Sequence, residues 1–210
     1  MSKKICALLV CIAVLMSTAV CSFADEPAAA FTDVPADAWY ARDVEEILLQ
    51  GIMEGDGGFF YPEKSLNRAM LVTILMRMDG TAEEPAESPD FSDVPADAWY
   101  AGAVAYAAAN GIAEGYGDGT FRPLKAVSRQ EFAVMLYNRQ IGDGLEHCEP
   151  AESQGFADSA SVSAWARDAM DWAVSSGVLR GSGDSLQPQR VLTRAEAAAA
   201  LNRLLKLSLD

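Results

Sequence analysis

Three arginines occupy the same position in three similar segments of the chain: Arg68, Arg129 and Arg194. Each directly follows Asn, Ser or Thr and precedes an apolar run, so each is expected in the first turn of a helix. The helix dipole disfavours a cation there by roughly a few tenths of a kcal/mol. A guanidinium beside helix N-terminal amides can instead grip a carboxylate through two parallel hydrogen bonds. The pattern predicts contact with a small anionic ligand, so replacing such an arginine with Ala should weaken binding with little loss of folding stability; an internal salt bridge is the alternative.

The residues that flank two of these arginines have a structural explanation. Ser128 with Glu131, and Thr193 with Glu196, have the spacing of capping boxes, in which the two side chains satisfy the amides that open a helix. The first copy departs from the pattern because Met70 replaces the glutamate. Its glycine-rich loop is also one residue shorter than that of the second copy. This helix start is therefore expected to be less stable, or the site beside it to bind differently.

An aspartate and a tryptophan also recur before the first helix of each copy. A carboxylate can accept hydrogen bonds from sugar hydroxyls, and an aromatic face can stack on a pyranose ring. The alternative is loop hydrogen bonding for the aspartates and core packing for the tryptophans. The candidates for ligand contact are Asp33, Asp93, Asp158, Trp39, Trp99 and Trp165.

Glycine-rich loops follow the first helix in each copy and begin at Gly55, Gly115 and Gly181. The second loop, 115–121, contains one acid where an EF-hand loop needs several, and no P-loop sequence occurs. Glycine permits tight turns and lets a ligand approach the backbone closely. We therefore place these three glycines in a ligand groove and expect neither a metal nor a cofactor.

The sequence offers little for catalysis. His147 is the single histidine and lies beside Cys148 in a polar segment. Such neighbours lack the buried third group that orients a nucleophile and its base. With 30 acidic residues a carboxylate pair is conceivable, but none has a distinctive context. We expect a protein that is not an enzyme.

These candidate residues are arranged by an internal repeat. The stretch 31–40 returns almost unchanged at 91–100, and a looser copy starts at Phe156 and reaches Trp165. Each copy continues with an apolar helix pattern, a glycine-rich loop and a second apolar run. In the first copy, Asp37 is placed to cap the first helix and Gly51 to end it. The predicted units are 31–78, 91–139 and 156–206, separated by polar linkers at 79–90 and 140–155.

A unit of about 45 residues without metal or disulfide buries too little surface to fold alone. We therefore expect one shared core and an all-α fold. Three helix–loop–helix repeats would stand in a pseudo-threefold arrangement around a central three-helix core.

Charge and the N-terminal segment exclude several classes of function. The chain of 210 residues has 16 basic and 30 acidic side chains and a net charge of −14, which argues against nucleic-acid binding and against adsorption on anionic lipid. Residues 1–24 are typical of a secretory signal, with Lys3 and Lys4 before an apolar stretch. An exported mature chain without a membrane-spanning segment would keep one cysteine, Cys148, and hence no internal disulfide.

The repeated motifs resemble the S-layer homology (SLH) family. The resemblance rests on the F-x-D-V-x-x-x-x-W opening, the G-x-x-x-G-x-G-D-G-x-F-x-P loop and the T-R-A-E-type helix start, and it covers residues 31–206. The second loop, Gly115 to Pro123, is most similar to the family pattern.

The resemblance implies three repeats around a central three-helix bundle, with sugar bound in grooves between neighbouring repeats. It implies non-covalent anchoring to an anionic secondary cell-wall polysaccharide that carries pyruvate, the arginine contacting the pyruvate carboxylate. The expected location is the cell surface, in the wall or S-layer. The alternative function is a scaffold in which the same grooves or the linkers dock another envelope protein.

Overall fold

A computed structural model describes residues 31–81, 91–142 and 155–207. The expected signal segment, His147, Cys148 and most of both expected linkers lie outside these ranges. The described residues form helices and loops and contain isolated β-bridges but no strand. This confirms the all-α fold. The α-helices are α1 (Ala41–Leu49), α2 (Arg68–Met78), α3 (Ala101–Ala109), α4 (Arg129–Gly142), α5 (Arg167–Ser175) and α6 (Arg194–Leu207).

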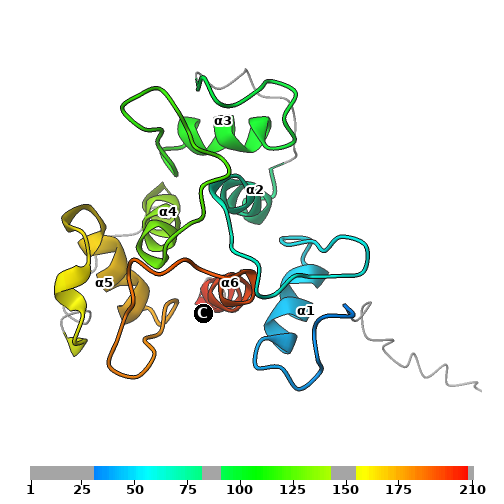
Figure 1. The fold of residues 1–210 in the computed structure, drawn as a ribbon, viewed down its shortest axis with the longest axis vertical. Coiled ribbons are helices and arrows are strands. Elements are labelled where there is room, and N and C mark those ends of the chain that lie inside the picture. Colours follow the sequence, from blue (N-terminus) through cyan, green and yellow to red (C-terminus); the bar gives the residue numbers. More distant parts are fainter. Residues whose placement is uncertain (1–30, 82–90, 143–154, 208–210) are drawn as a thin grey trace, which may run out of the picture.

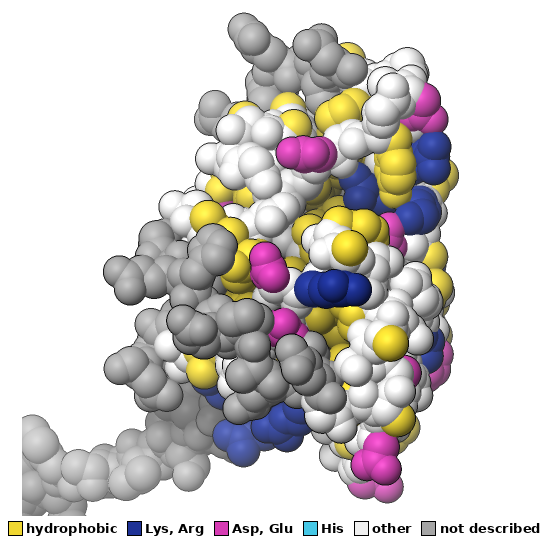
Figure 2. Space-filling model, turned by 90° about the vertical axis from the view of Figure 1, so that its left-hand side faces the viewer, with side chains coloured by type: hydrophobic (Ala, Val, Ile, Leu, Met, Phe, Trp, Pro, Cys, Tyr) yellow, Lys and Arg dark blue, Asp and Glu magenta, His cyan; other side chains and the backbone are white. Residues whose placement is uncertain are grey.

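Each repeat contributes one outer and one central helix. Figure 1 shows α2, α4 and α6 nearly end-on around the middle, with α1, α3 and α5 outside them. In the third repeat two short 3₁₀ helices, Ser159–Ser161 and Ala164–Ala166, precede α5. The coloured body is narrower than it is tall when seen from the side (Figure 2), so the helices form a flattened particle.

The two helices of one repeat do not pack against each other. Instead α2 packs on α3 of the second repeat, α4 on α5 of the third, and α6 on α1 of the first. Each central helix therefore buries its apolar side against the outer helix of the next repeat, and the last pairing closes the circle. One continuous apolar cluster results, with Trp172 buried within it.

A ring of backbone hydrogen bonds joins the segments that lead into the central helices. The Leu66 amide donates to the Leu192 carbonyl (3.0 Å), Val127 to Leu66 (2.9 Å) and Leu192 to Val127 (2.9 Å). All three side chains are fully buried. The ring fixes where each central helix begins, and so places the three repeated arginines.

Helix boundaries follow local signals only in part. Gly51 adopts a φ of +68°, which favours glycine, directly after the C-cap of α1. The expectation that Asp37 caps this helix is wrong, because the N-cap residue is Tyr40 and no side chain caps it. A turn closed by the Ala41 amide, which donates to the Ala38 carbonyl (3.0 Å), lies between Asp37 and the helix.

Candidate functional site: grooves built from three repeats

The three repeated arginines are buried and reach into the neighbouring repeat. Nε of Arg68 donates to the Phe121 carbonyl (2.9 Å), and Nη2 donates to the Glu114 carbonyl (2.7 Å). The same two bonds join Arg129 to Leu186 (2.8 Å) and Arg180 (2.7 Å), and Arg194 to Phe60 (2.8 Å) and Glu54 (2.7 Å). Each arginine therefore clamps the glycine-rich loop of the next repeat, with the third closing on the first.

The partners of these arginines are main-chain carbonyls, not carboxylates. Among the described residues, Nη1 of each guanidinium makes no hydrogen bond or ion pair. Burial lowers the pKa of all three side chains, but a guanidinium stays protonated at neutral pH. Each therefore brings one charged, unused edge to the space beside a loop.

The sequence predicted that the N-terminal amides of the central helices help to bind an anion, but these amides are already hydrogen-bonded within the protein. The first two amides of each central helix donate to carbonyls of the neighbouring repeat. For α6 the Arg194 amide donates to Lys64 (2.9 Å) and the Ala195 amide to Pro62 (2.9 Å). The third amide is capped by the side chain of Asn67, Ser128 or Thr193. At these helix starts an anion can therefore be held only by the arginine side chains.

The motif aspartates are engaged within their own repeats. Asp33 accepts from the Phe60 (2.8 Å) and Tyr61 (2.7 Å) amides, and Asp93 and Asp158 hold the equivalent loop residues. Tyr61 and its counterparts have φ near +55°, a strained region for a residue with a side chain. A hydrogen bond from the Ser185 hydroxyl, followed by the loop amides, lowers the pKa of Asp158. These carboxylates hold each loop in its strained turn.

The motif glycines make close packing with an aromatic ring possible. A Cβ on Gly115 would lie 2.2 Å from Cε1 of Phe91, and the same close approach occurs at Gly55 with Phe31 and at Gly181 with Phe156. The ring of the opening motif thus lies directly on the loop. The structure gives each of these glycines a packing reason beside the ligand-contact hypothesis.

The motif tryptophans are not in the core. Trp39, Trp99 and Trp165 are 65%, 62% and 60% exposed, so the core-packing alternative is wrong for them. Trp99 lines one cavity and Trp39 another, each on a repeat that contributes neither the loop nor the arginine of that cavity. Three repeats therefore meet at each cavity.

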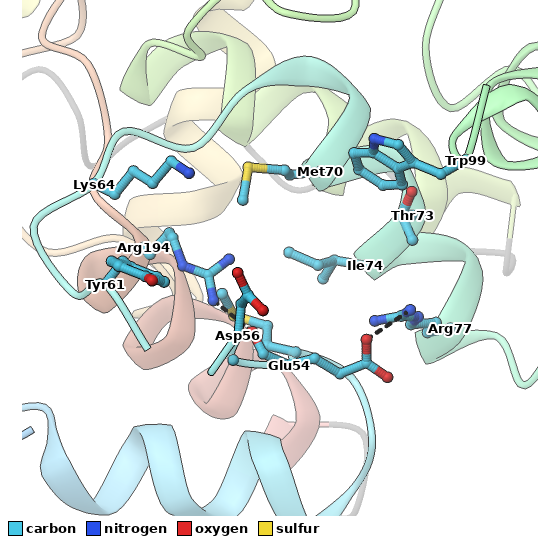
Figure 3. A pocket seen from close by; sticks show the side chains of 12 residues that line it. Glu54, Asp56, Tyr61, Lys64, Met70, Thr73, Ile74, Arg77, Trp99 and Arg194 are labelled. Atoms are coloured by element: carbon cyan, nitrogen blue, oxygen red, sulfur yellow. Dashed lines mark hydrogen bonds and ion pairs between the residues drawn. The ribbon is translucent and has the colours of Figure 1, made fainter. Parts of the chain in front are cut away.

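The first groove, a cavity of about 490 Å³, lies beside the loop of the first repeat. Figure 3 shows Arg194 and Tyr61 on one side and Trp99 on the other, with Ile74 between them. The acids that line it are Asp56 and Glu54, and Glu54 is paired with Arg77 (3.1 Å). An apolar floor, an exposed indole and a cationic edge suit a sugar that carries an acidic group.

The third groove has the same construction and a smaller cavity, of about 160 Å³, beside the loop of the third repeat. Arg129 takes the place of Arg194, and Trp39 that of Trp99. Its lining adds Arg180, Arg190 and Arg203, with Glu196 as the one acid in it.

The second groove would pair the loop of the second repeat with Arg68. Here the Tyr116 ring occupies the space, with its centroid 5.2 Å from Cζ of Arg68, 3.9 Å from Cζ of Arg122 and 5.5 Å from Nζ of Lys125. The Asp118 carboxylate in turn pairs with Arg122 at 2.8 Å. The protein's own aromatic ring therefore lies against the cations that a ligand of this groove would contact.

The first groove differs from the others at residue 70, where methionine replaces the glutamate of the repeat pattern. Glu131 accepts from the Ser128 amide (2.9 Å) and pairs with Lys125, and Glu196 does the same with Thr193 (3.1 Å) and Arg190. Met70 stands at this position in the first repeat, so Lys64 has no carboxylate partner among the described residues. The methionine therefore leaves the ammonium group of Lys64 available in the first groove, beside Arg194.

Sequence reasoning missed several groove residues. Lys64, Lys125 and Arg190 each stand four positions before a repeated arginine, a regularity that the repeat alignment could have revealed. Arg180 was missed because the other two repeats have glutamate at its position. Arg203, the counterpart of Arg77, was missed because the second repeat has Asn138 there. Within residues 31–81, 91–142 and 155–207, His, Cys, Asp and Glu form no cluster that could hold a metal ion.

Comparison with known proteins agrees with the repeat. The profile of the S-layer homology domain matches residues 30–69, 90–133 and 155–198. The chain belongs to the S-layer homology family. None of the helices in the described part of this SLH chain is long and apolar enough to span a membrane.

Its relatives include the surface-layer 125 kDa protein of Lysinibacillus sphaericus, 33% identical over 92% of this chain and 16% of that protein. The cellulosome-anchoring protein of Acetivibrio thermocellus is 32% identical over 71% of this chain and 34% of that protein. An amylopullulanase of Thermoanaerobacterium thermosulfurigenes is 33% identical over 85% of this chain and 10% of the enzyme. The SLH chain thus spans between 10% and 34% of the length of these relatives.

Proposed function

We propose that this SLH chain is a non-catalytic, exported module that holds non-covalently to an anionic secondary cell-wall polysaccharide at the cell surface. The observation that carries the proposal is convergence. At each of two cavities, an arginine edge from one repeat, a glycine-rich loop from a second and an exposed tryptophan from a third meet. Such a site binds only when all three repeats are assembled.

The charge distribution supports an anionic ligand. After the first 24 residues the chain has 14 basic side chains and 30 acidic ones. Seven of the basic ones line the first and third grooves, against three acids. On the face seen in Figure 2, basic and acidic side chains are scattered rather than gathered in one basic patch. The positive charge of this acidic protein is thus concentrated where a ligand could enter.

The surface-layer and anchoring roles named for two relatives support attachment to the cell envelope. The family resemblance suggests ketal-linked pyruvate as the acidic group. A carboxylate on a pyranose fits a groove that offers Nη1 of Arg194, Lys64 and the Trp99 ring. The alternative, docking of another envelope protein in the same grooves, makes a different prediction for wall from which the polysaccharide has been removed.

The experiment is a pull-down of residues 25–210 on purified wall, with and without prior removal of the secondary polymer. Binding that requires the polymer supports the proposal, and equal retention on stripped wall contradicts it. Removal of pyruvate by mild acid should abolish binding, because the guanidinium edge loses its carboxylate. Binding should survive a rise from low to physiological salt, since both partners are negative and partly buried pairs are screened little.

Tryptophan variants localise the interaction. Trp39→Ala and Trp99→Ala should each weaken binding by up to about tenfold through the lost ring contact, with unchanged stability because both indoles are exposed. The matched control is Trp165→Ala, since Trp165 lines neither of these two cavities and the groove it would complete is filled by Tyr116. A Trp39→Ala, Trp99→Ala double variant that binds like the parent would contradict groove binding.

A further inference from the structure

The first and third grooves share a construction but not a charge. At the loop position where the first two repeats have Glu54 and Glu114, the third repeat has Arg180. In the first groove Glu54 pairs with Arg77 across the cavity (3.1 Å). In the third groove Arg203 stands at the position of Arg77, and it faces an arginine instead of a glutamate.

The third groove therefore gathers like charges without neutralising them. Arg129, Arg180 and Arg203 line a cavity of about 160 Å³ together with Arg190. The one lining acid, Glu196, is already paired with Arg190 at 2.5 Å. Two acids outside the lining interact electrostatically with these arginines, Asp158 with Arg129 and Asp43 with Arg203. Asp158 is engaged with the loop amides, and Asp43 accepts from Asn202 (2.7 Å). Three guanidinium groups are left around one small space without a carboxylate partner inside it.

The hydrogen bonds of these arginines leave donors free for a ligand. Arg129 uses Nε and Nη2 on the carbonyls of Leu186 and Arg180, and Arg203 uses Nη1 on the carbonyl of Val178. The Arg180 side chain is exposed at the mouth of the cavity. Burial lowers the pKa of Arg203, and the neighbouring Arg180 lowers it further, so these charges repel each other in the absence of a counter-ion. A bound anion would relieve that repulsion.

The charge of the ligand follows from this count. The first groove is lined by three basic and two acidic side chains, an excess of one positive charge, which suits a single carboxylate beside Nη1 of Arg194 and Lys64. The third groove is lined by four basic side chains and one acidic one, an excess of three positive charges around a smaller cavity, which suits a compact group that carries two negative charges. Resting on the proposed function, we infer that the third groove takes a dianionic group of the wall polymer, a phosphate or a closely spaced pair of carboxylates. The first groove takes a sugar with a single carboxylate. The two grooves thus recognise different chemical groups.

The test uses small anions and residues 25–210, without wall polymer. Inorganic phosphate above its second pKa, malonate and acetate are titrated at equal ionic strength, and the backbone amide shifts of residues 179–187 are followed by NMR. Either dianion should bind at these amides more tightly than acetate, by about tenfold or more for one additional charged hydrogen bond. The tighter of the two distinguishes a phosphate from paired carboxylates.

Arg180→Glu restores the residue type of the other two repeats. Arg203 then gains a carboxylate, as Arg77 has in Glu54, so the fold should be kept while dianion affinity at the third groove falls by about tenfold or more. The matched control is Glu54→Arg, which gives the first groove the same excess of arginine. It should confer dianion binding at the amides of residues 53–61.

Two results would overturn the inference: equal shifts with acetate and the dianions at 179–187, or undiminished dianion binding by Arg180→Glu. Neither result would contradict the proposed function, because the wall pull-down tests polymer binding as such and the first groove could bind the polymer without the third. Conversely, dianion binding that depends on Arg180, in a chain that ignores the polymer, would keep this site and reject polysaccharide anchoring.

Discussion

Each repeated arginine divides its guanidinium between two tasks. Nε and Nη2 hold carbonyls of a neighbouring loop, and Nη1 is left at the edge of a groove. The helix dipole disfavours a cation at this position by roughly a few tenths of a kcal/mol, and two charge-assisted bonds outweigh that amount. The expectation that an arginine could be removed at little cost in folding stability is therefore revised: these side chains also join the repeats.

Replacing Arg129 with Ala should destabilise the whole protein. The Leu186 and Arg180 carbonyls would lose their donors, and the free energy of unfolding should fall by about 2–3 kcal/mol. Chemical denaturation measures this. Arg42→Ala is the control, because Arg42 is an exposed side chain paired only within α1, and its change should stay within about 0.5 kcal/mol. Equal stability of the two variants would contradict the clamp.

The glycine-rich loops are elements built around two constraints that act together. An aspartate at the start of each repeat holds two loop amides, including that of a residue with positive φ. A phenylalanine ring lies against the first glycine of the same loop. Both constraints join residues 24 to 29 positions apart in the sequence, so the loop keeps its shape only when the start of the repeat is packed on it.

Two alanine substitutions in one loop separate packing from chain entropy. Gly115→Ala places a Cβ 2.2 Å from the Phe91 ring and should lower the free energy of unfolding by about 1–3 kcal/mol through overpacking. Gly117→Ala meets nothing within 4 Å and should be neutral or stabilise by up to about 1 kcal/mol. Thermal melts of both variants check this. A destabilising Gly117→Ala would show that the loop is sensitive to any Cβ.

At the scale of the whole molecule, the repeats are held together by packing between helices of different repeats. Every central helix packs on the outer helix of the next repeat, and a closed ring of backbone bonds joins their starts. The circle closes between α6 and α1, where the buried Asn202 amide donates to Asp43 (2.7 Å) and Glu46 (2.6 Å). A repeat cut from the chain would lose the partners of both its helices.

Residues 25–210 should therefore unfold in a single cooperative transition. Agreement between the calorimetric and van't Hoff enthalpies, and coincident transitions by circular dichroism and tryptophan fluorescence, would check this. A fragment of residues 91–139 is expected to be unfolded on its own, because α3 and α4 pack on helices of other repeats. Separate transitions, or a folded fragment, would contradict the shared core.

The closing contact should be sensitive to acid. A hydrogen bond from Lys206, followed by one from Asn202, lowers the pKa of Glu46 from 4.5 to about 2. The stability that Glu46 contributes is fully present above pH 4.5 and is lost as the pH falls toward 2. Glu46→Gln should thus be less stable than the parent near neutral pH, and the difference should shrink over that range. Denaturation measured at a series of pH values tests this, and a difference independent of pH would contradict it.

Local patterns in the sequence were enough for much of this description. Three copies of one motif predicted the all-α fold, the helix pairs and the family. Because the motif repeats in register, Arg68, Arg129 and Arg194 could be recognised as equivalent, as could the three tryptophans. Hydrophobic period, capping residues and glycine position act within about one helix length, so they can be read without tertiary structure.

Only the tertiary structure decided which repeat each side chain serves. Trp99, Arg194 and the loop at Gly55 meet in one groove although they belong to three repeats. The sequence also left open that Tyr116 fills the second groove and that Arg180 and Arg203 share the third. The physical reason is that a single helix–loop–helix unit buries too little surface alone. Its apolar faces, and with them its functional side chains, must find partners in neighbouring repeats, and that pairing leaves no local pattern.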